Sequence, residues 1–151
     1  MTQGAALELP RFATGGLGLR RYVPDIGSMS GIRRFEELKA WQAARDLTRE
    51  VYRASASGEI ARDFSFQKQL RSAAVSAMAN IAEGFNRARP GEFGQFLSIA
   101  KGSCAEVQSH LYVALDAGYF DPPTYSELRR LSDEAIRLTT ALRASLRAKD
   151  R

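Results

Sequence analysis

Four polar residues in the middle of the chain are spaced so that they could form one site. Asn80, Glu83 and Arg87 recur at intervals of three and four residues, which places them on one face of a helix. Glu106 falls on the next predicted helix, and an antiparallel neighbour could bring it to the same region. The group could bind a phosphate or another ligand, or it could be a buried polar network that fixes helix register or a subunit interface. We favour the network, because carboxylates without a nucleophile or a metal partner rarely indicate catalysis.

A second candidate site is a set of arginines on the polar face of the last predicted helix. They are Arg129, Arg130, Arg137, Arg143 and Arg147. Each could neutralise one backbone phosphate of RNA or DNA and so add affinity that depends on salt but not on base sequence. The alternative is a solvated face that is balanced by Glu127, Asp133 and Glu134. No motif for reading bases is visible.

The other chemistry-bearing residues form no catalytic or metal-binding pattern. Cys104 is the only cysteine and His110 the only histidine, so an internal disulfide is excluded and a zinc site would need mostly carboxylates. No nucleophile is patterned with His110, and Gly102-Ser103 lacks the preceding strand and the Gly-Lys-Ser/Thr sequence of a phosphate loop. Cys104 falls on an apolar stripe and is expected in the core. We therefore expect no enzymatic activity, no metal and no cofactor.

The composition is that of a small basic globular protein. The 151 residues include 22 Lys and Arg against 17 Asp and Glu, a formal net charge of +5. This charge allows a polyanionic partner without requiring one. No apolar run approaches the roughly 20 residues that cross a bilayer, and no signal peptide is evident. The sequence therefore predicts a cytoplasmic protein that is not inserted in a membrane.

Residues 1–33 differ in composition from the rest of the chain. Glycines and prolines interrupt them, and no helical or alternating period persists. Such a segment buries too little apolar surface to offset the entropy of ordering it, which predicts a disordered tail. Met29 lies just before the predicted domain, so translation could start there. We expect removal of the preceding residues to leave the helical content and the melting temperature unchanged.

Residues 34–151 carry apolar residues at the spacing of four amphipathic helices. The predicted boundaries are an end of the first helix at Ser55, a start of the second near Asp63 or Ser65, a third from Pro90 to Gly118, and a fourth from Pro123 or Thr124. Gly84 is expected to end or kink the second helix, and Trp41 to anchor the core. Short loops predict an all-α, antiparallel up-down-up-down four-helix bundle. The second helix is apolar on two faces, which predicts self-association.

The middle of the chain resembles a known family. The residues that carry the resemblance are Ser76-Ala77-Met78-Ala79-Asn80-Ile81-Ala82-Glu83-Gly84, Arg87, Glu92-Phe93, Phe96-Leu97, Ile99-Ala100, Gly102-Ser103 and Glu106. The pattern is similar to the four-helix-bundle proteins of the 23S ribosomal RNA intervening sequence. It departs from them at Ala77 and Met78, where Ile and Pro are usual, and at Arg89, where a Ser or Thr often caps the helix.

The resemblance implies a cytoplasmic four-helix bundle that assembles as a ring-like homopentamer. A related branch, the accessory protein of diversity-generating retroelements, binds nucleic acid and a reverse transcriptase. Together with the arginines, this gives a leading hypothesis of a basic, homo-oligomeric, non-enzymatic scaffold that binds RNA, DNA or a nucleic-acid enzyme. The alternative is a structural or regulatory bundle that binds a protein partner and has no nucleic-acid role.

Overall fold

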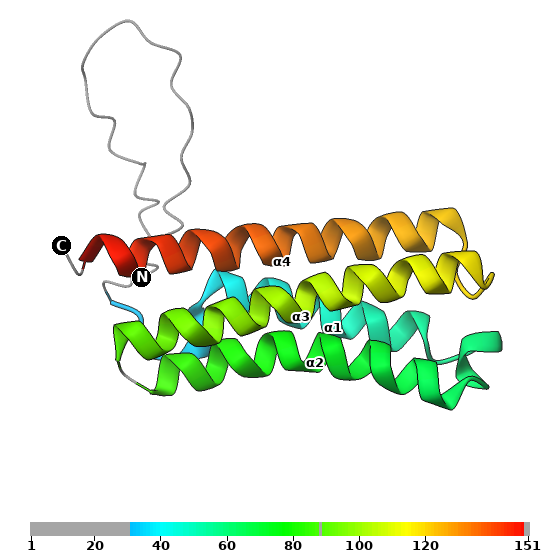
Figure 1. The fold of residues 1–151 in the computed structure, drawn as a ribbon, viewed down its shortest axis with the longest axis horizontal. Helices are drawn as coiled ribbons and strands as arrows, with labels where there is room; N and C mark the ends of the chain where they lie inside the picture. Colours follow the sequence, from blue (N-terminus) through cyan, green and yellow to red (C-terminus); the bar gives the residue numbers. More distant parts are fainter. Residues whose placement is uncertain (1–30, 88, 150–151) are drawn as a thin grey trace, which may run out of the picture.

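Four α-helices account for most of the structure, which is a computed structural model that describes residues 31–87 and 89–149. They are α1 (Lys39–Ala54), α2 (Phe64–Asn86), α3 (Pro90–Asp116) and α4 (Pro122–Lys149), with short 3-10 helices at Phe35–Glu37 and Glu59–Ala61. Within these ranges there is no strand. Consecutive helices run in opposite directions (Figure 1), which confirms the predicted up-down-up-down bundle.

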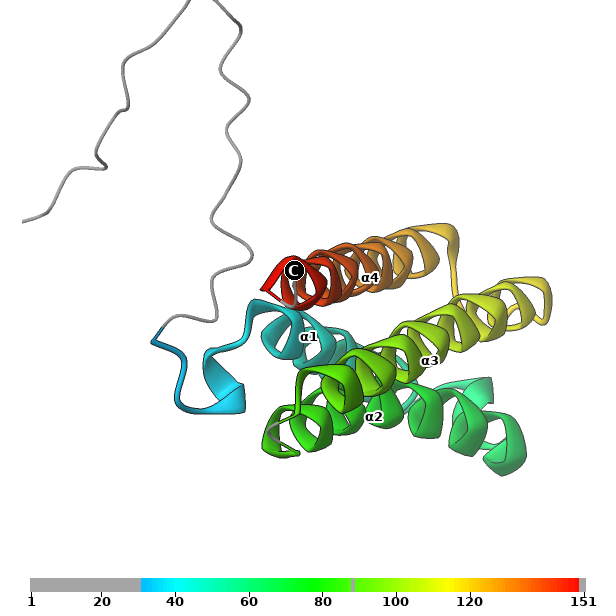
Figure 2. The same ribbon diagram turned by 60° about the vertical axis from the view of Figure 1, so that its left-hand side comes forward.

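Each helix packs against its neighbour in sequence, and α4 closes the bundle by packing against α1. Figure 2 shows this arrangement in a view turned by 60°. The α3–α4 pair forms one side of the bundle along most of its length (Figure 1). The seam between these two helices is the part of the fold that positions the candidate site.

The core forms where the apolar stripes of the four helices meet. Its fully buried members include Leu47, Leu70, Leu97, Leu111 and Leu128. Trp41 is only 9% exposed and meets the Phe35 ring edge-on at a centroid distance of 5.1 Å, which confirms it as a core residue. Cys104 is also buried, as predicted from its place on the apolar stripe.

Local chemistry explains the helix ends. The Asp63 carboxylate accepts a hydrogen bond from the Phe66 N–H (3.1 Å) and so caps α2. Pro90 occupies the first turn of α3, where its missing N–H costs no hydrogen bond. Gly118 adopts φ 74°, the left-handed conformation that ends α3. The α4 helix begins at Pro122, slightly earlier than predicted.

The expectation that Gly84 ends α2 is wrong, because the helix continues through it to Asn86. Gly84 is buried, and a Cβ atom there would lie 2.6 Å from the Phe96 Cβ atom and 2.8 Å from the Phe93 Cδ2 atom. The glycine is therefore a point where α2 and α3 approach closely.

Most of the predicted tail, including Met29, lies outside the described residues. Residues 31–33 belong to the described part, and Ile32 packs half-buried against the core. The domain therefore includes residues before the predicted boundary at 34. Among the described residues, no helix is both long and apolar enough to cross a bilayer.

Candidate functional site

The structure separates the four polar residues that were predicted to share a site. Asn80 turns toward its own helix and donates hydrogen bonds to the Ser76 carbonyl (2.8 Å) and the Ser76 hydroxyl (3.0 Å). The Ser76 and Ser103 hydroxyls are 2.9 Å apart, which links α2 to α3. Of the four predicted residues, only Asn80 belongs to this half-buried chain of polar groups.

Glu83 and Arg87 form a separate pair on the surface of α2. Their side chains are each 51% exposed, and the Arg87 guanidinium donates to the Glu83 carboxylate at 2.7 Å. The guanidinium also lies 5.4 Å from the centre of the Phe96 ring. The hydrogen bond to Glu83 raises the pKa of Arg87. An exposed pair of this kind adds little to stability.

Glu106 does not join these residues, so the expectation of one four-residue group is wrong. The Ser76–Ser103 contact sets the antiparallel register, and it places Glu106 opposite residues near position 73. That position is ten residues, or about 15 Å of helix, from Glu83. Glu106 instead lies 3.4 Å from the imidazole Nε2 atom of His110.

The five arginines of α4 divide into two groups. Arg130 makes two hydrogen bonds to the Glu127 carboxylate (2.7 and 2.9 Å), and Arg137 makes two to the Glu134 carboxylate (2.8 and 2.9 Å). Each pair lowers the pKa of its glutamate, chiefly through the hydrogen bond from the arginine. These two arginines fit the balanced, solvated face that was the alternative interpretation.

Arg129 faces α3 and is held there. Its guanidinium donates to the Tyr112 hydroxyl and to the Asp133 carboxylate, both at 3.3 Å. The hydrogen bond with Tyr112 is the main cause of the raised pKa of Arg129. Gln108 donates to the same aspartate at 2.8 Å. The charge of Arg129 is therefore partly balanced within the seam.

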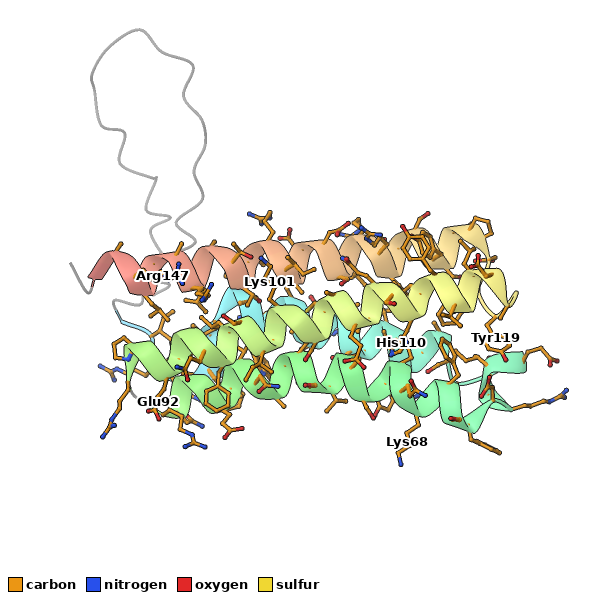
Figure 3. The ribbon with its side chains drawn as sticks, viewed as in Figure 1. Lys68, Glu92, Lys101, His110, Tyr119 and Arg147 are labelled. Carbon is orange, nitrogen blue, oxygen red and sulfur yellow. The ribbon has the colours of Figure 1, made fainter. Side chains whose placement is uncertain are left out.

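Arg143 and Arg147 also face α3, where they meet Lys101. The three side chains line a cleft of about 230 Å³ between α3 and α4, together with Leu97, Thr139, Thr140 and Ala144. Figure 3 shows Lys101 and Arg147 along this seam. The Arg143 Nε–H donates to the Gly94 carbonyl at 3.2 Å, which fixes its guanidinium across the seam. We call Lys101, Arg143 and Arg147 the basic seam.

A second cleft of about 240 Å³ adjoins the first at the start of α3. It shares Arg143 and Arg147 with the first cleft, and its other lining residues are Pro90, Gly91, Gly94, Gln95 and Leu146. No side chain caps the N-terminus of α3 among the described residues. The helix end therefore presents partial positive charge beside the arginines.

Within residues 31–87 and 89–149, no carboxylate forms an ion pair with any of the three members of the basic seam. Glu92, in the first turn of α3, lies on the side of α2, away from the seam (Figure 3). The basic seam is therefore a local concentration of positive charge that suits an anion.

Sequence reasoning missed Lys101, because a single lysine on α3 gives no signal by itself. Only the pairing of α3 with α4 brings it to Arg143 and Arg147.

In the described part of the chain, no group of three or more His, Cys, Asp and Glu side chains is placed to hold a metal ion. Burial raises the pKa of the Cys104 thiol to about 12. The thiol is thus protonated at neutral pH, which makes it a poor nucleophile.

Comparison with known proteins supports one family. The family model of the 23S rRNA-intervening sequence protein matches residues 36–141. The matched range begins just before α1 and ends within α4, so it includes most of the bundle. A search of the curated proteins finds no match.

Proposed function

Because the chain belongs to the 23S rRNA-intervening sequence protein family, we propose that it is a non-enzymatic, homo-oligomeric scaffold that holds RNA or DNA. The observation that carries this proposal is the basic seam, where Lys101, Arg143 and Arg147 line one cleft. The family resemblance supports the homo-oligomer in this proposal, and the basic seam supports the contact with nucleic acid.

The contact would be with phosphates and not with bases. Lysine ammonium and arginine guanidinium groups form strong, charge-assisted hydrogen bonds with phosphate oxygens. Each neutralised phosphate releases bound counterions, so affinity falls as salt rises. Contacts with phosphates carry no direct sequence information, so binding through the basic seam would tolerate many sequences.

Self-association is supported by apolar side chains on the outer surface of the bundle. Ile99 and Val113 of α3 are 52% and 48% exposed, and Val75 of α2 is 40% exposed. Burying them against other copies of the chain would remove apolar surface from water. The resemblance suggests that the ring of subunits is a pentamer. Such a ring would carry one basic seam on each subunit, and the repeated charges would raise the positive electrostatic potential around the assembly.

A pair of double variants tests this function. Arg143→Gln with Arg147→Gln removes two positive charges from the seam, and Arg130→Gln with Arg137→Gln removes two from the balanced face of α4. Both lower the net charge by the same amount. We expect the first to weaken binding of a 30-nucleotide RNA and a matching DNA about tenfold, and the second to weaken it much less.

Fluorescence anisotropy at low salt measures both affinities, and circular dichroism checks that each variant keeps its helices. Equal losses in the two variants would show that only net charge matters. Absence of binding by the wild-type protein at low salt would contradict the proposal. The second candidate, a bundle that binds a protein partner such as a reverse transcriptase without itself contacting nucleic acid, would then be favoured.

A further inference from the structure

We propose that the cleft lined by Lys101, Thr139, Arg143 and Arg147 is a discrete seat for a single phosphate group. This inference deepens the proposed function and rests on it for the source of the phosphate. It differs from diffuse electrostatic attraction because it assigns a bounded site, a defined set of donors and a role to an uncharged residue.

The uncharged residue is Thr139. It is 1% exposed, and among the described residues its hydroxyl has no hydrogen-bond partner. The other buried helical threonine, Thr48, shows the usual solution, since its hydroxyl donates to the Ala44 carbonyl (2.8 Å) and lies 2.9 Å from the Ala74 carbonyl. A buried hydroxyl without a partner is costly. Thr139 lines the cleft, but its hydroxyl oxygen is closed off from solvent in this rotamer, so a turn about χ1 is needed to present it to a ligand oxygen.

Threonine in a helix has two accessible χ1 positions, so its hydroxyl can turn without movement of the backbone. Three basic residues line the same cleft as Thr139. Arg143 is held to the Gly94 carbonyl through Nε, and among the described residues its two terminal nitrogens form no hydrogen bond. These two nitrogens form the end of the guanidinium fork that matches two phosphate oxygens. Lys101 approaches from α3, and Arg147 lies one turn beyond Arg143 on α4.

The size of the cleft limits the ligand. Its volume of about 230 Å³ lies below the roughly 300–1,000 Å³ of typical small-molecule sites. A single phosphate with part of its sugar suits this space better than a whole nucleotide cofactor. The second cleft shares Arg143 and Arg147 and adjoins the uncapped start of α3. A neighbouring phosphate of the same strand could follow that path.

Inorganic phosphate is the probe that tests the site directly. The full chain is titrated with sodium phosphate against sodium chloride at equal ionic strength and pH, with heteronuclear NMR shifts and the melting temperature as readouts. We expect saturable shifts around Thr139 and a higher melting temperature in phosphate than in chloride. Thr139→Val should raise the melting temperature without phosphate and weaken phosphate binding several-fold. Thr139→Ser should retain the binding, and Arg130→Gln should behave as wild type.

Oligonucleotides separate the sources of the phosphate. Saturable, Thr139-dependent binding of inorganic phosphate without binding of RNA or DNA would support the phosphate seat for a free anion and contradict the proposed function. Seam-dependent binding of oligonucleotides, with no preference for phosphate over chloride and no effect of Thr139→Val, would overturn the seat and leave the proposed function standing. Binding of both probes with the same dependence on Thr139 supports both.

Discussion

Gly84 has only a hydrogen atom in place of a side chain, and this lets α2 and α3 pack closely at that position. A Cβ atom there would meet Phe96 and Phe93 at 2.6 and 2.8 Å, well inside van der Waals contact. We expect Gly84→Ala to lower the free energy of unfolding by about 1–3 kcal/mol through overpacking. The loss should occur although alanine favours a helix over glycine by roughly 0.5–1 kcal/mol.

Gly102 provides the matched control for this substitution. It also lies inside a helix, α3, but a Cβ atom there would meet nothing within 4 Å. Gly102→Ala should therefore leave stability unchanged or raise it by up to about 1 kcal/mol. Urea unfolding followed by circular dichroism measures both changes. If the two alanine variants are equally stable, the close approach of α2 and α3 at Gly84 is not what the structure indicates.

Cys104 gives a second test at the scale of one residue. Its thiol is buried, and desolvation raises its pKa to about 12. Alkylating reagents attack the thiolate, so the folded protein should resist iodoacetamide at pH 8 while the urea-unfolded protein reacts readily. Mass spectrometry after timed quenching reports the modified fraction. Rapid labelling of the native protein would place Cys104 outside the core.

At the scale of elements, Asp63 connects the start of α2 to the loop after α3. One carboxylate oxygen accepts the Phe66 N–H at 3.1 Å, and the other accepts the Tyr119 hydroxyl at 2.8 Å. Asp63→Ala removes both bonds and should lower the free energy of unfolding by about 1–2 kcal/mol. Tyr119→Phe removes only the second bond and should cost less. Thermal unfolding of the two variants would contradict this account if Tyr119→Phe were the more damaging.

The helices themselves could be predicted from sequence, and their mutual register could not. Apolar periodicity located all four helices, and the residues at Asp63, Pro90 and Gly118 located three of their ends. Periodicity describes one helix at a time, whereas the site depends on which residues of two helices meet. The expected approach of Glu106 to Glu83 failed for that reason.

The candidate site was predictable only in part. Arg143 and Arg147 could be identified on the polar face of α4, but they were grouped there with Arg130 and Arg137. The signal that separates the two pairs is in the sequence, because Glu127 and Glu134 lie three residues before Arg130 and Arg137 and pair with them on the helix surface. Lys101 and Thr139 could be recognised as members of the site only from the packing of α3 against α4.

At the scale of the whole molecule, we expect a homo-oligomer, with a pentamer as the state that the resemblance suggests. Ile99→Asp with Val113→Asp places charge at two half-exposed apolar side chains of α3 and should shift the protein toward monomers without loss of helical signal. Mass photometry and light scattering at micromolar concentration measure the size. A wild-type protein that remains monomeric under these conditions would contradict the prediction.

The central claim is that the basic seam binds the nucleic-acid backbone, and the salt dependence of binding tests it most directly. The measurement is the slope of log affinity against log salt concentration for a single-stranded RNA, for the wild type and for Lys101→Gln with Arg143→Gln and Arg147→Gln. Each lost phosphate contact should reduce the slope by about 0.7, so loss of the one phosphate in the cleft, or of that phosphate and its neighbour, should decrease the slope by about 0.7 to 1.4 per engaged subunit. An unchanged slope in a folded triple variant would show that nucleic acid binds elsewhere, or that the seam serves another anion.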